Sequence, residues 1–312
     1  MKDLKVIFMG TPRFSVPILE ALIEKYNVIL VVTQPDALLK KEVNYSPVKK
    51  LALNYNINII QPDNIASNAE EIAKLKPDII ITCAYGQIIP KNILDIPKYG
   101  CINVHASLLP KLRGGAPIHR AIMNGHSKTG ITIMKMVSKM DAGDIISQAE
   151  TIISAEDNVG LLHERLSIMG RDLLIDTLPN IITGNINPIK QDESLVTYAW
   201  NIKREDEKID FDKSKKEIFN QIRGLNPWPG AYSVLDDKII KIWEAKIGEH
   251  GTSKHYNGEI INIYDDGIGV KVSDGEIIFS VIQPEGKPKM KVKDFLNGIK
   301  NKEQIISKIF KY

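Results

Sequence analysis

Short runs of nearly continuous isoleucine, valine and leucine alternate with amphipathic stretches along the first part of this chain. The runs lie at residues 6–10, 27–34, 57–61, 77–86 and 100–105. Between the first two runs, the segment VPILEALIEKY repeats its apolar positions at the spacing of a helix. Strands that are apolar on both faces and separated by helices are typical of a parallel sheet covered on both sides. The pattern therefore predicts an α/β fold with a Rossmann-like, mostly parallel sheet.

A second group of elements follows. APIHRAIMNG and a long amphipathic segment that ends at Gly184 are predicted as helices, and TGITIMKMV and DIISQAETI are predicted as a pair of strands. These elements cover residues 116–125, 159–184, 129–137 and 144–152, respectively.

The character of the chain changes after the long helix. Residues 189–206 are polar and mixed in composition, which is typical of an extended linker. From residue 207 onward, short strands are separated by the turn sequences DDK, DDG and SDG, which favour a small antiparallel β-barrel of OB-like type. We therefore expect a catalytic domain at 1–188, a linker at 189–206 and a C-terminal barrel at 207–312.

Composition limits the functions that this chain can have. Its 312 residues are 43% hydrophobic and 25% charged, as in a globular protein large enough for two domains. The formal net charge of +3 is too small to make the whole molecule a polycation, so a nucleic-acid partner requires local basic patches. The apolar stretch near the N-terminus is too short for a signal-peptide core or a membrane span, which predicts a cytoplasmic protein without a membrane partner.

Two cofactor classes are not expected from the residues. Cys83 and Cys101 are the only cysteines and lack C-x-x-C spacing, so we expect them to pack as small apolar groups. The six histidines are scattered, and no metal site is predicted. The first strand-to-helix turn, GTPRFS, lacks the second and third glycines of a dinucleotide-binding turn, and no acidic residue closes residues 27–34. An NAD cofactor is therefore not predicted, and Gly10 is explained by a tight turn.

The stretch NVHASLLPKLRGGAPIHR, residues 103–120, holds the best candidates for chemistry. Asn103 and His105 lie two apart near the end of a predicted strand, so their side chains point to one face at the sheet edge where α/β proteins bind ligands. An amide can hydrogen-bond a carbonyl oxygen while an imidazole moves a proton. Asp141, in the turn MDAGD, can orient that imidazole. From spacing alone, a His that caps a loop and an Asn that fixes a turn explain the pair equally well.

NVHASLLPKLRGGAPIHRAIMNG, followed by TGITIMKMVSKMDAGDII, resembles the signature of the folate-dependent formyltransferase family. FMGTPRFSVPILEAL, VVTQPD, SPVK, AYGQIIP and NPWPGAY are similar to the members that formylate methionyl-tRNA, so the resemblance covers nearly the whole chain. It implies transfer of a formyl group from 10-formyltetrahydrofolate to the α-amine of methionyl initiator tRNA. It also implies catalytic roles for Asn103, His105 and Asp141, and folate contacts at Ser107, Leu108, Leu109 and Pro110.

The resemblance also directs attention to residues beyond the signature. A pterin and a benzoyl ring need an apolar slot, which Ile88 and Ile89 are expected to line together with the two leucines of SLLP. The tRNA needs a basic surface. Four lysines of GKPKMKVK recur at period two, which predicts one basic face on an extended segment, although lysines on an edge strand also prevent aggregation. These are Lys287, Lys289, Lys291 and Lys293.

The loop after VVTQPD departs from the family pattern. Family members have a loop rich in glycine and basic residues here, whereas this chain has ALLKKEVNY, with Lys40 and Lys41 but no arginine and no glycine. We expect these two lysines to contact the acceptor arm, although how the loop recognises it stays open. The other readings are a nucleotide-sugar N-formyltransferase, a formyl-folate hydrolase and a silent folate- or tRNA-binding module. Nothing in the sequence indicates an oligomer, so a monomer is expected.

Overall fold

The computed structural model describes residues 3–39, 42–249, 254–299 and 301–311. Its contacts divide the chain into two compact units, each of which is assembled from three segments. The first unit comprises Met1–Pro117, Lys128–Ile152 and His163–Trp200. The second comprises Ile118–Ser127, Ile153–Leu162 and Asn201–Tyr312. The units are therefore interleaved along the chain, whereas the domains expected from the sequence are contiguous.

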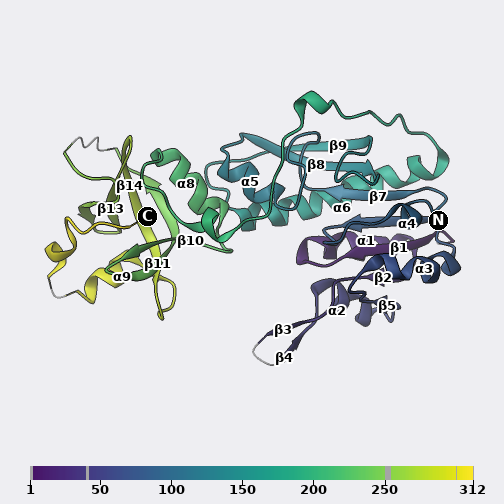
Figure 1. Cartoon of the computed structure of the whole chain (residues 1–312), viewed down its shortest axis with the longest axis horizontal. Helices are drawn as coiled ribbons and strands as arrows, with labels where there is room; N and C mark the ends of the chain where they lie inside the picture. The colour runs from purple at the N-terminus through teal and green to yellow at the C-terminus, as the bar shows by residue number, and fades with distance from the viewer. Residues whose placement is uncertain (1–2, 40–41, 250–253, 300, 312) are drawn as a thin grey trace. The chain divides into compact units, whose positions relative to one another are not determined.

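The first unit is built on a seven-stranded sheet in the order β5-β2-β1-β6-β7-β8-β9 (Figure 1). All neighbours from β5 to β7 pair in parallel, and β8 is antiparallel to β7 and β9. The strands are β1 (Lys5–Gly10), β2 (Asn27–Val32), β5 (Ile59–Ile60), β6 (Ile79–Cys83), β7 (Cys101–His105), β8 (Lys128–Lys135) and β9 (Ile145–Ile152). The predicted Rossmann-like, mostly parallel sheet is confirmed.

Helices cover the sheet because its strands are apolar on both faces. Ile7 of β1 packs in one core cluster with Ile72 of α3 and Ile93 of α4. On another face, the position of Gly170 in α6 lies against Val104 of β7. In chain order, the helices and short turns up to residue 195 are η1 (Arg13–Ser15), α1 (Val16–Lys25), α2 (Pro47–Asn54), η2 (Ile65–Asn68), α3 (Ala69–Leu75), α4 (Lys91–Leu94), α5 (Pro117–Met123), α6 (Val159–Thr183) and η3 (Glu193–Leu195). Of these, α5 after Pro117 and the first turn of α6 belong to the second unit. The short strands β3 (Ala37–Leu39) and β4 (Glu42–Asn44) pair antiparallel with each other.

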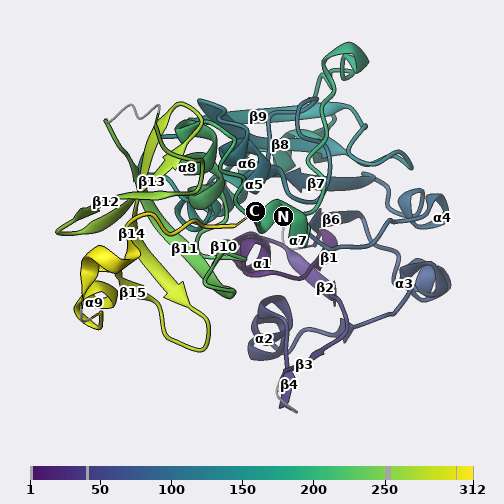
Figure 2. The ribbon, with the colours of Figure 1, turned by 60° about the vertical axis from the view of Figure 1, so that its left-hand side comes forward.

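The second unit carries an antiparallel sheet in the order β10-β11-β14-β13-β12, with β15 paired to β14 (Figure 2). The predicted turns DDK, DDG and SDG connect β10 to β11, β12 to β13 and β13 to β14. The strands are β10 (Ala231–Leu235), β11 (Lys238–Ile247), β12 (Ile260–Tyr264), β13 (Gly267–Val272), β14 (Gly275–Pro284) and β15 (Met290–Lys291). The helices and turns are α7 (Arg204–Glu207), α8 (Lys215–Gly224), α9 (Val292–Asn297) and η4 (Lys302–Ile305).

The C-terminal segment joins the two outer edges of this sheet. The backbone N–H of Lys311 donates to the carbonyl oxygen of Val234 in β10 at 2.8 Å. The N–H of Phe310 donates to Gly258, just before β12, at 2.9 Å. Phe310 also packs in the core of the unit against Phe211 and Phe279. The segment therefore satisfies edge backbone groups that an open sheet leaves exposed, which gives the sheet its predicted barrel-like character.

None of the helices among the described residues is both long enough and apolar enough to cross a membrane. Within the same residues, no three His, Cys, Asp or Glu side chains are grouped so that they can hold a metal ion.

Candidate functional site

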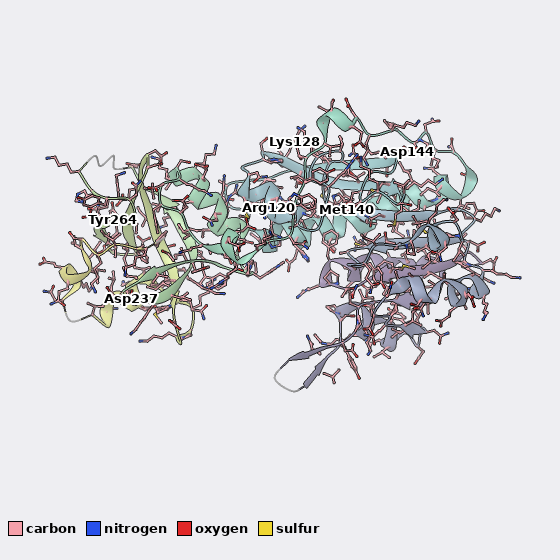
Figure 3. The ribbon with its side chains drawn as sticks, viewed as in Figure 1. Arg120, Lys128, Met140, Asp144, Asp237 and Tyr264 are labelled. Carbon is pink, nitrogen blue, oxygen red and sulfur yellow. The ribbon has the colours of Figure 1, made fainter. Side chains whose placement is uncertain are left out.

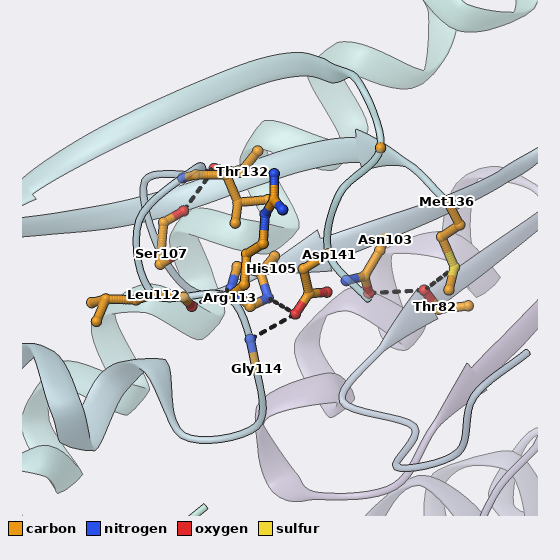
Figure 4. A network of polar contacts seen from close by, with 12 residues as sticks. Thr82, Asn103, His105, Ser107, Leu112, Arg113, Gly114, Thr132, Met136 and Asp141 are labelled. Atoms are coloured by element: carbon orange, nitrogen blue, oxygen red, sulfur yellow. Dashed lines mark hydrogen bonds and ion pairs between the residues drawn. The ribbon is translucent and has the colours of Figure 1, made fainter. Parts of the chain in front are cut away.

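Strand β7 places Asn103 and His105 at its end, as the alternation of side chains predicts (Figure 4). The β6–β7 register sets Asn103 beside Thr82, whose hydroxyl donates to Asn103 Oδ1 at 2.8 Å. This bond orients the side-chain amide of Asn103. Because Oδ1 is held by the Thr82 hydroxyl, the Nδ2 hydrogens point away from Thr82. Among the described residues, no partner is assigned to Nδ2. The strand therefore offers an oriented N–H donor for a carbonyl oxygen.

His105 is buried, and each of its ring nitrogens faces an oxygen atom. Its Nε2 lies 3.0 Å from the carbonyl oxygen of Leu112. A carbonyl oxygen only accepts, so Nε2 carries the hydrogen in this bond. Nδ1 lies 3.7 Å from Oδ2 of Asp141, which is longer than a direct hydrogen bond. The imidazole is thus fixed in orientation, and its Nδ1 faces a carboxylate across a short gap.

Asp141 lies in the turn between β8 and β9, next to Met140, which Figure 3 labels together with Asp144. Its φ of 49° is in the left-handed region, which costs a non-glycine residue free energy and persists only where surrounding contacts fix it. The backbone N–H of Gly114 donates to Oδ2 at 2.8 Å. The structure therefore brings the three residues predicted to be catalytic into one constellation: an amide, an imidazole and a carboxylate (Figure 4).

The loop that follows β7 is anchored on β8 and β9 through its first residues. The Thr132 hydroxyl donates to the carbonyl oxygen of Ser107 at 2.6 Å and accepts from the N–H of Leu109 at 3.1 Å. The Gln148 side chain donates to the carbonyl oxygen of Leu109 at 2.9 Å. Leu109 packs with Met134 and Ile145 in a small apolar cluster. Ser107 to Pro110 are therefore held in a defined conformation directly beside His105.

The next residues of the same loop are anchored by residues 197–199, which lie in the stretch 189–206 expected to be a linker. The N–H of Arg113 donates to the carbonyl oxygen of Thr197 at 2.9 Å, and the N–H of Ala199 donates back to Arg113 at 2.7 Å. The Thr197 hydroxyl accepts from the N–H of Leu112 at 2.9 Å. This segment therefore fixes the loop residue whose carbonyl oxygen holds His105.

Side chains of the same segment extend the network. Arg113 is fully buried, and its Nη2 donates to Oε1 of Gln191 at 2.8 Å and to Oε1 of Glu193 at 2.8 Å. The hydrogen bonds from Arg113 and Lys139 lower the pKa of Glu193 to about 2. The Nε2 of Gln191 donates to the carbonyl oxygens of Asp141 and Gly143 at 2.8 and 2.7 Å. Gln191 thus links the loop after β7 to the turn of Asp141.

Sequence reasoning missed Arg113, Gln191 and Glu193. An arginine in the loop after β7 and a short Gln-Asp-Glu run in a polar stretch are the local signals, and neither indicates that these residues meet.

The motif segments of the first strands also converge. Thr11, Gln34 and Tyr85 come from the ends of β1, β2 and β6, and both Thr11 and Gln34 donate to the carbonyl oxygen of Tyr85. Asp36 of TQPD pairs with Lys49 of SPVK at 2.5 Å, and the hydrogen bond from Lys49 lowers the pKa of that carboxyl group. The separate segments that resemble one family therefore form one polar network at the carboxyl edge of the sheet.

Ile88 and Ile89 lie in different environments. Ile89 is buried in the core cluster with Ile80 and Ile93, whereas the Ile88 side chain is 80% exposed. A shared role for the two in a donor slot stays a prediction.

The C-terminal lysines do not lie on one extended segment, so this geometric expectation is wrong. Lys287 lies in a bend that Gln283 closes by donating to its carbonyl oxygen at 3.0 Å, and Lys291 belongs to β15. Lys293 is in α9, which begins at Val292 because this buried side chain packs into the barrel core. The ammonium group of Lys289 lies over the Trp243 ring, 5.0 Å from its centroid. The two-residue alternation of the lysines therefore ends where α9 begins at Val292. Two further predicted tRNA contacts, Lys40 and Lys41, lie outside the described residues.

Comparison with known proteins shows the family of this chain. Residues 4–178 match the formyl transferase family, and residues 201–300 match the formyl transferase C-terminal domain. The chain belongs to the formyl transferase family. Relatives include the methionyl-tRNA formyltransferases of Bacillus velezensis, 52% identical over 300 residues, and Bacillus subtilis, 51% identical over 301 residues. Each match covers 94% of this chain and 94% of the relative. The family resemblance found in the sequence is confirmed.

Solved structures show the same fold at lower identity. The N-formyltransferase from Helicobacter canadensis in complex with folinic acid and dTDP-3-aminofucose is 22% identical, with a TM-score of 0.66 over 90% of this chain and 99% of that chain. HypX from Aquifex aeolicus in complex with tetrahydrofolic acid is 18% identical, with a TM-score of 0.62 over 93% of this chain and 46% of that chain. At these identities the likeness concerns the fold alone.

Proposed function

We propose that this protein transfers the formyl group of 10-formyltetrahydrofolate to the α-amine of methionyl initiator tRNA. The observation that carries the proposal is the convergence of Asn103, His105 and Asp141 at the end of β7, in a chain about half identical to methionyl-tRNA formyltransferases along nearly its whole length. The proposal makes the protein an enzyme of translation initiation, acting in the cytoplasm.

The geometry supports a division of roles. Attack of an amine on the formyl carbon creates a tetrahedral intermediate whose oxygen carries negative charge. The Asn103 amide hydrogens are oriented donors for that oxygen, and such a donor contributes about 10²- to 10³-fold to the rate. The amine must lose a proton and the folate N10 must gain one. His105 moves that proton, with Asp141 stabilising the charged ring across the 3.7 Å gap, for about 10²- to 10⁴-fold more.

Folate and tRNA contacts belong to the same proposal. Ser107, Leu108, Leu109 and Pro110 form the donor side, because their backbone is fixed against β8 and β9 beside His105. Ile88 and Ile89 remain proposed parts of the apolar slot. Lysines of the C-terminal unit and the two lysines that follow Leu39 in the sequence supply the phosphate contacts of the tRNA. The proposed lysines are Lys40, Lys41, Lys287, Lys289, Lys291 and Lys293.

The test is incubation of the full chain with 10-formyltetrahydrofolate and one of two acceptors, methionyl initiator tRNA or a 4-amino nucleotide sugar, with buffer alone as the third condition. Tetrahydrofolate release and the mass of each acceptor are followed. Formyl-methionyl-tRNA alone is the expected product. A formylated sugar contradicts the proposed acceptor, and tetrahydrofolate release in buffer alone would identify a hydrolase.

Variants test the residue roles in the same assay. His105→Ala is expected to abolish turnover while the affinity for the folate donor stays unchanged. Asn103→Ala is expected to lower kcat by about 10²- to 10³-fold, because one oxyanion donor is lost. Normal turnover in His105→Ala would contradict the role of the imidazole.

A further inference from the structure

Tyr198 and Trp200 form an exposed aromatic pair on the segment that clamps the catalytic loop. Their ring centroids lie 5.0 Å apart, and the two ring planes differ by 8°, so the rings are stacked. The residues are 44% and 59% exposed, respectively. Large aromatic side chains left this exposed gain less from folding than buried ones, and stacked rings can bind a further flat group only on an outer face.

The backbone brings this pair next to the candidate catalytic residues. The backbone of Tyr198 forms a parallel β-bridge with that of Arg113. The residues on either side of Arg113 are Leu112 and Gly114, whose backbone groups contact His105 and Asp141, respectively. The loop residues Leu112 to Gly114 thus lie between the backbone of the aromatic segment and the side chains of His105 and Asp141.

Two successive stretches of the loop after β7 have different anchors. Ser107 and Leu109 are bonded to Thr132 of β8, which is the side proposed for the folate donor. Leu112 and Arg113 are bonded to the 197–199 segment, which carries the aromatic pair. The segment with the aromatic pair is therefore bonded to a different stretch of the loop from the one proposed to face the folate donor.

We propose that Tyr198 and Trp200 form a stacking platform for the base of the terminal tRNA nucleotide that carries the methionyl ester. This inference rests on the proposed function, which makes that RNA the acceptor. The ester joins methionine to the terminal ribose, so the base of that nucleotide lies only a few bonds from the attacking amine. Every base has a flat π-face that stacks on aromatic side chains without sequence readout. A platform here positions the amine through its own nucleotide.

The first experiment measures KM for both substrates in Trp200→Ala. KM for methionyl-tRNA is expected to rise by about 5- to 100-fold, as for the loss of one base–aromatic stack, while KM for 10-formyltetrahydrofolate stays within about twofold. Trp200→Phe and Tyr198→Phe keep an aromatic ring and are expected to retain most of the affinity. Leu195→Ala removes an exposed apolar side chain, 52% exposed, from the same segment and serves as the matched control without an effect. A raised KM for folate instead would place the pterin on the pair and overturn the proposal.

The second experiment removes the base rather than the ring, and needs no formyl transfer. Binding of the full chain is measured with two methionylated RNA hairpins that copy the acceptor end, one intact and one with an abasic terminal nucleotide. The wild type is expected to bind the intact hairpin more tightly, and Trp200→Ala is expected to bind both alike. Equal affinity of the wild type for the two hairpins overturns the platform. Failure of the proposed function appears separately, as absence of formyl transfer by the wild type.

Discussion

The side-chain amide of Gln191 donates to the backbone carbonyl oxygen of Asp141 at 2.8 Å, although the two residues are 50 positions apart. Asp141 adopts a left-handed φ of 49°, which an aspartate maintains only when its neighbours hold it. Gln191 also accepts from the buried Arg113. A residue outside the candidate catalytic set therefore holds the backbone of the aspartate whose carboxylate faces His105.

Replacement of Gln191 tests this positioning. Gln191→Glu retains an acceptor for Arg113 but replaces the N–H donor to Asp141 with an oxygen. We expect kcat to fall by up to about 100-fold, because displacing a reacting group by about 1 Å is enough for such a loss. KM for both substrates should change little, and the pH–rate profile should shift as the carboxylate moves relative to His105. A lower melting temperature with an unchanged kcat and pH profile would assign Gln191 a structural role only.

Gly143 allows the turn that carries Asp141 to pack. A Cβ at this position would lie 1.6 Å from the carbonyl oxygen of Lys135, which is backbone and cannot move aside. Gly143→Ala is therefore expected to lower the free energy of unfolding by about 1–3 kcal/mol and to reduce formyl transfer. Urea denaturation measures the first effect. Gly298→Ala is the control, since the nearest atom to its Cβ lies at an ordinary 3.4 Å. Equal midpoints for the two variants would contradict the close approach.

The lowered pKa of Glu193 predicts how the free energy of unfolding changes at acidic pH. Its pKa is lowered to about 2 by hydrogen bonds from Arg113 and Lys139, so folding favours the charged carboxylate. A lowered pKa stabilises the folded state above the unfolded value of about 4.5, and this contribution is lost as the pH falls from there toward 2. The effect is modest, because the Glu193 side chain is 58% exposed. Unfolding of wild type and Glu193→Gln should differ at pH 6 and converge near pH 2. A difference that persists at pH 2 would rule out this linkage.

The cysteine thiols should resist modification in the folded protein. Burial raises the pKa of Cys83 to about 12, and burial with the nearby Asp95 carboxylate raises that of Cys101 to about 12. Both thiols are also inaccessible to solvent. We expect no reaction with a thiol reagent at pH 8 in buffer and two equivalents in denaturant. Rapid labelling of the native protein would show that these strands open.

Several features were predictable from sequence because they depend on neighbouring residues alone. Apolar runs predicted the parallel strands, and the turn sequences DDK, DDG and SDG predicted the hairpins of the barrel. Alternation on one strand placed Asn103 and His105 on the same face. The same alternation gave a wrong prediction for the lysines after Gly286. They do not share one extended segment, because a helix begins at the buried Val292 within the periodic stretch.

The sequence by itself therefore determined the two kinds of sheet, the family and the three candidate catalytic residues, because periodicity and motif spacing are properties of short segments. Only the tertiary structure decided that a polar stretch resembling a linker clamps the catalytic loop, with Gln191 holding the turn of Asp141 and Tyr198 bridging Arg113. Hydrogen bonds between residues 50 or more positions apart depend on the path of the folded chain, and no local pattern specifies which distant partners will meet. The barrel is likewise joined by its last residues, because the free edges of β10 and of the chain before β12 come to lie within reach of the same segment.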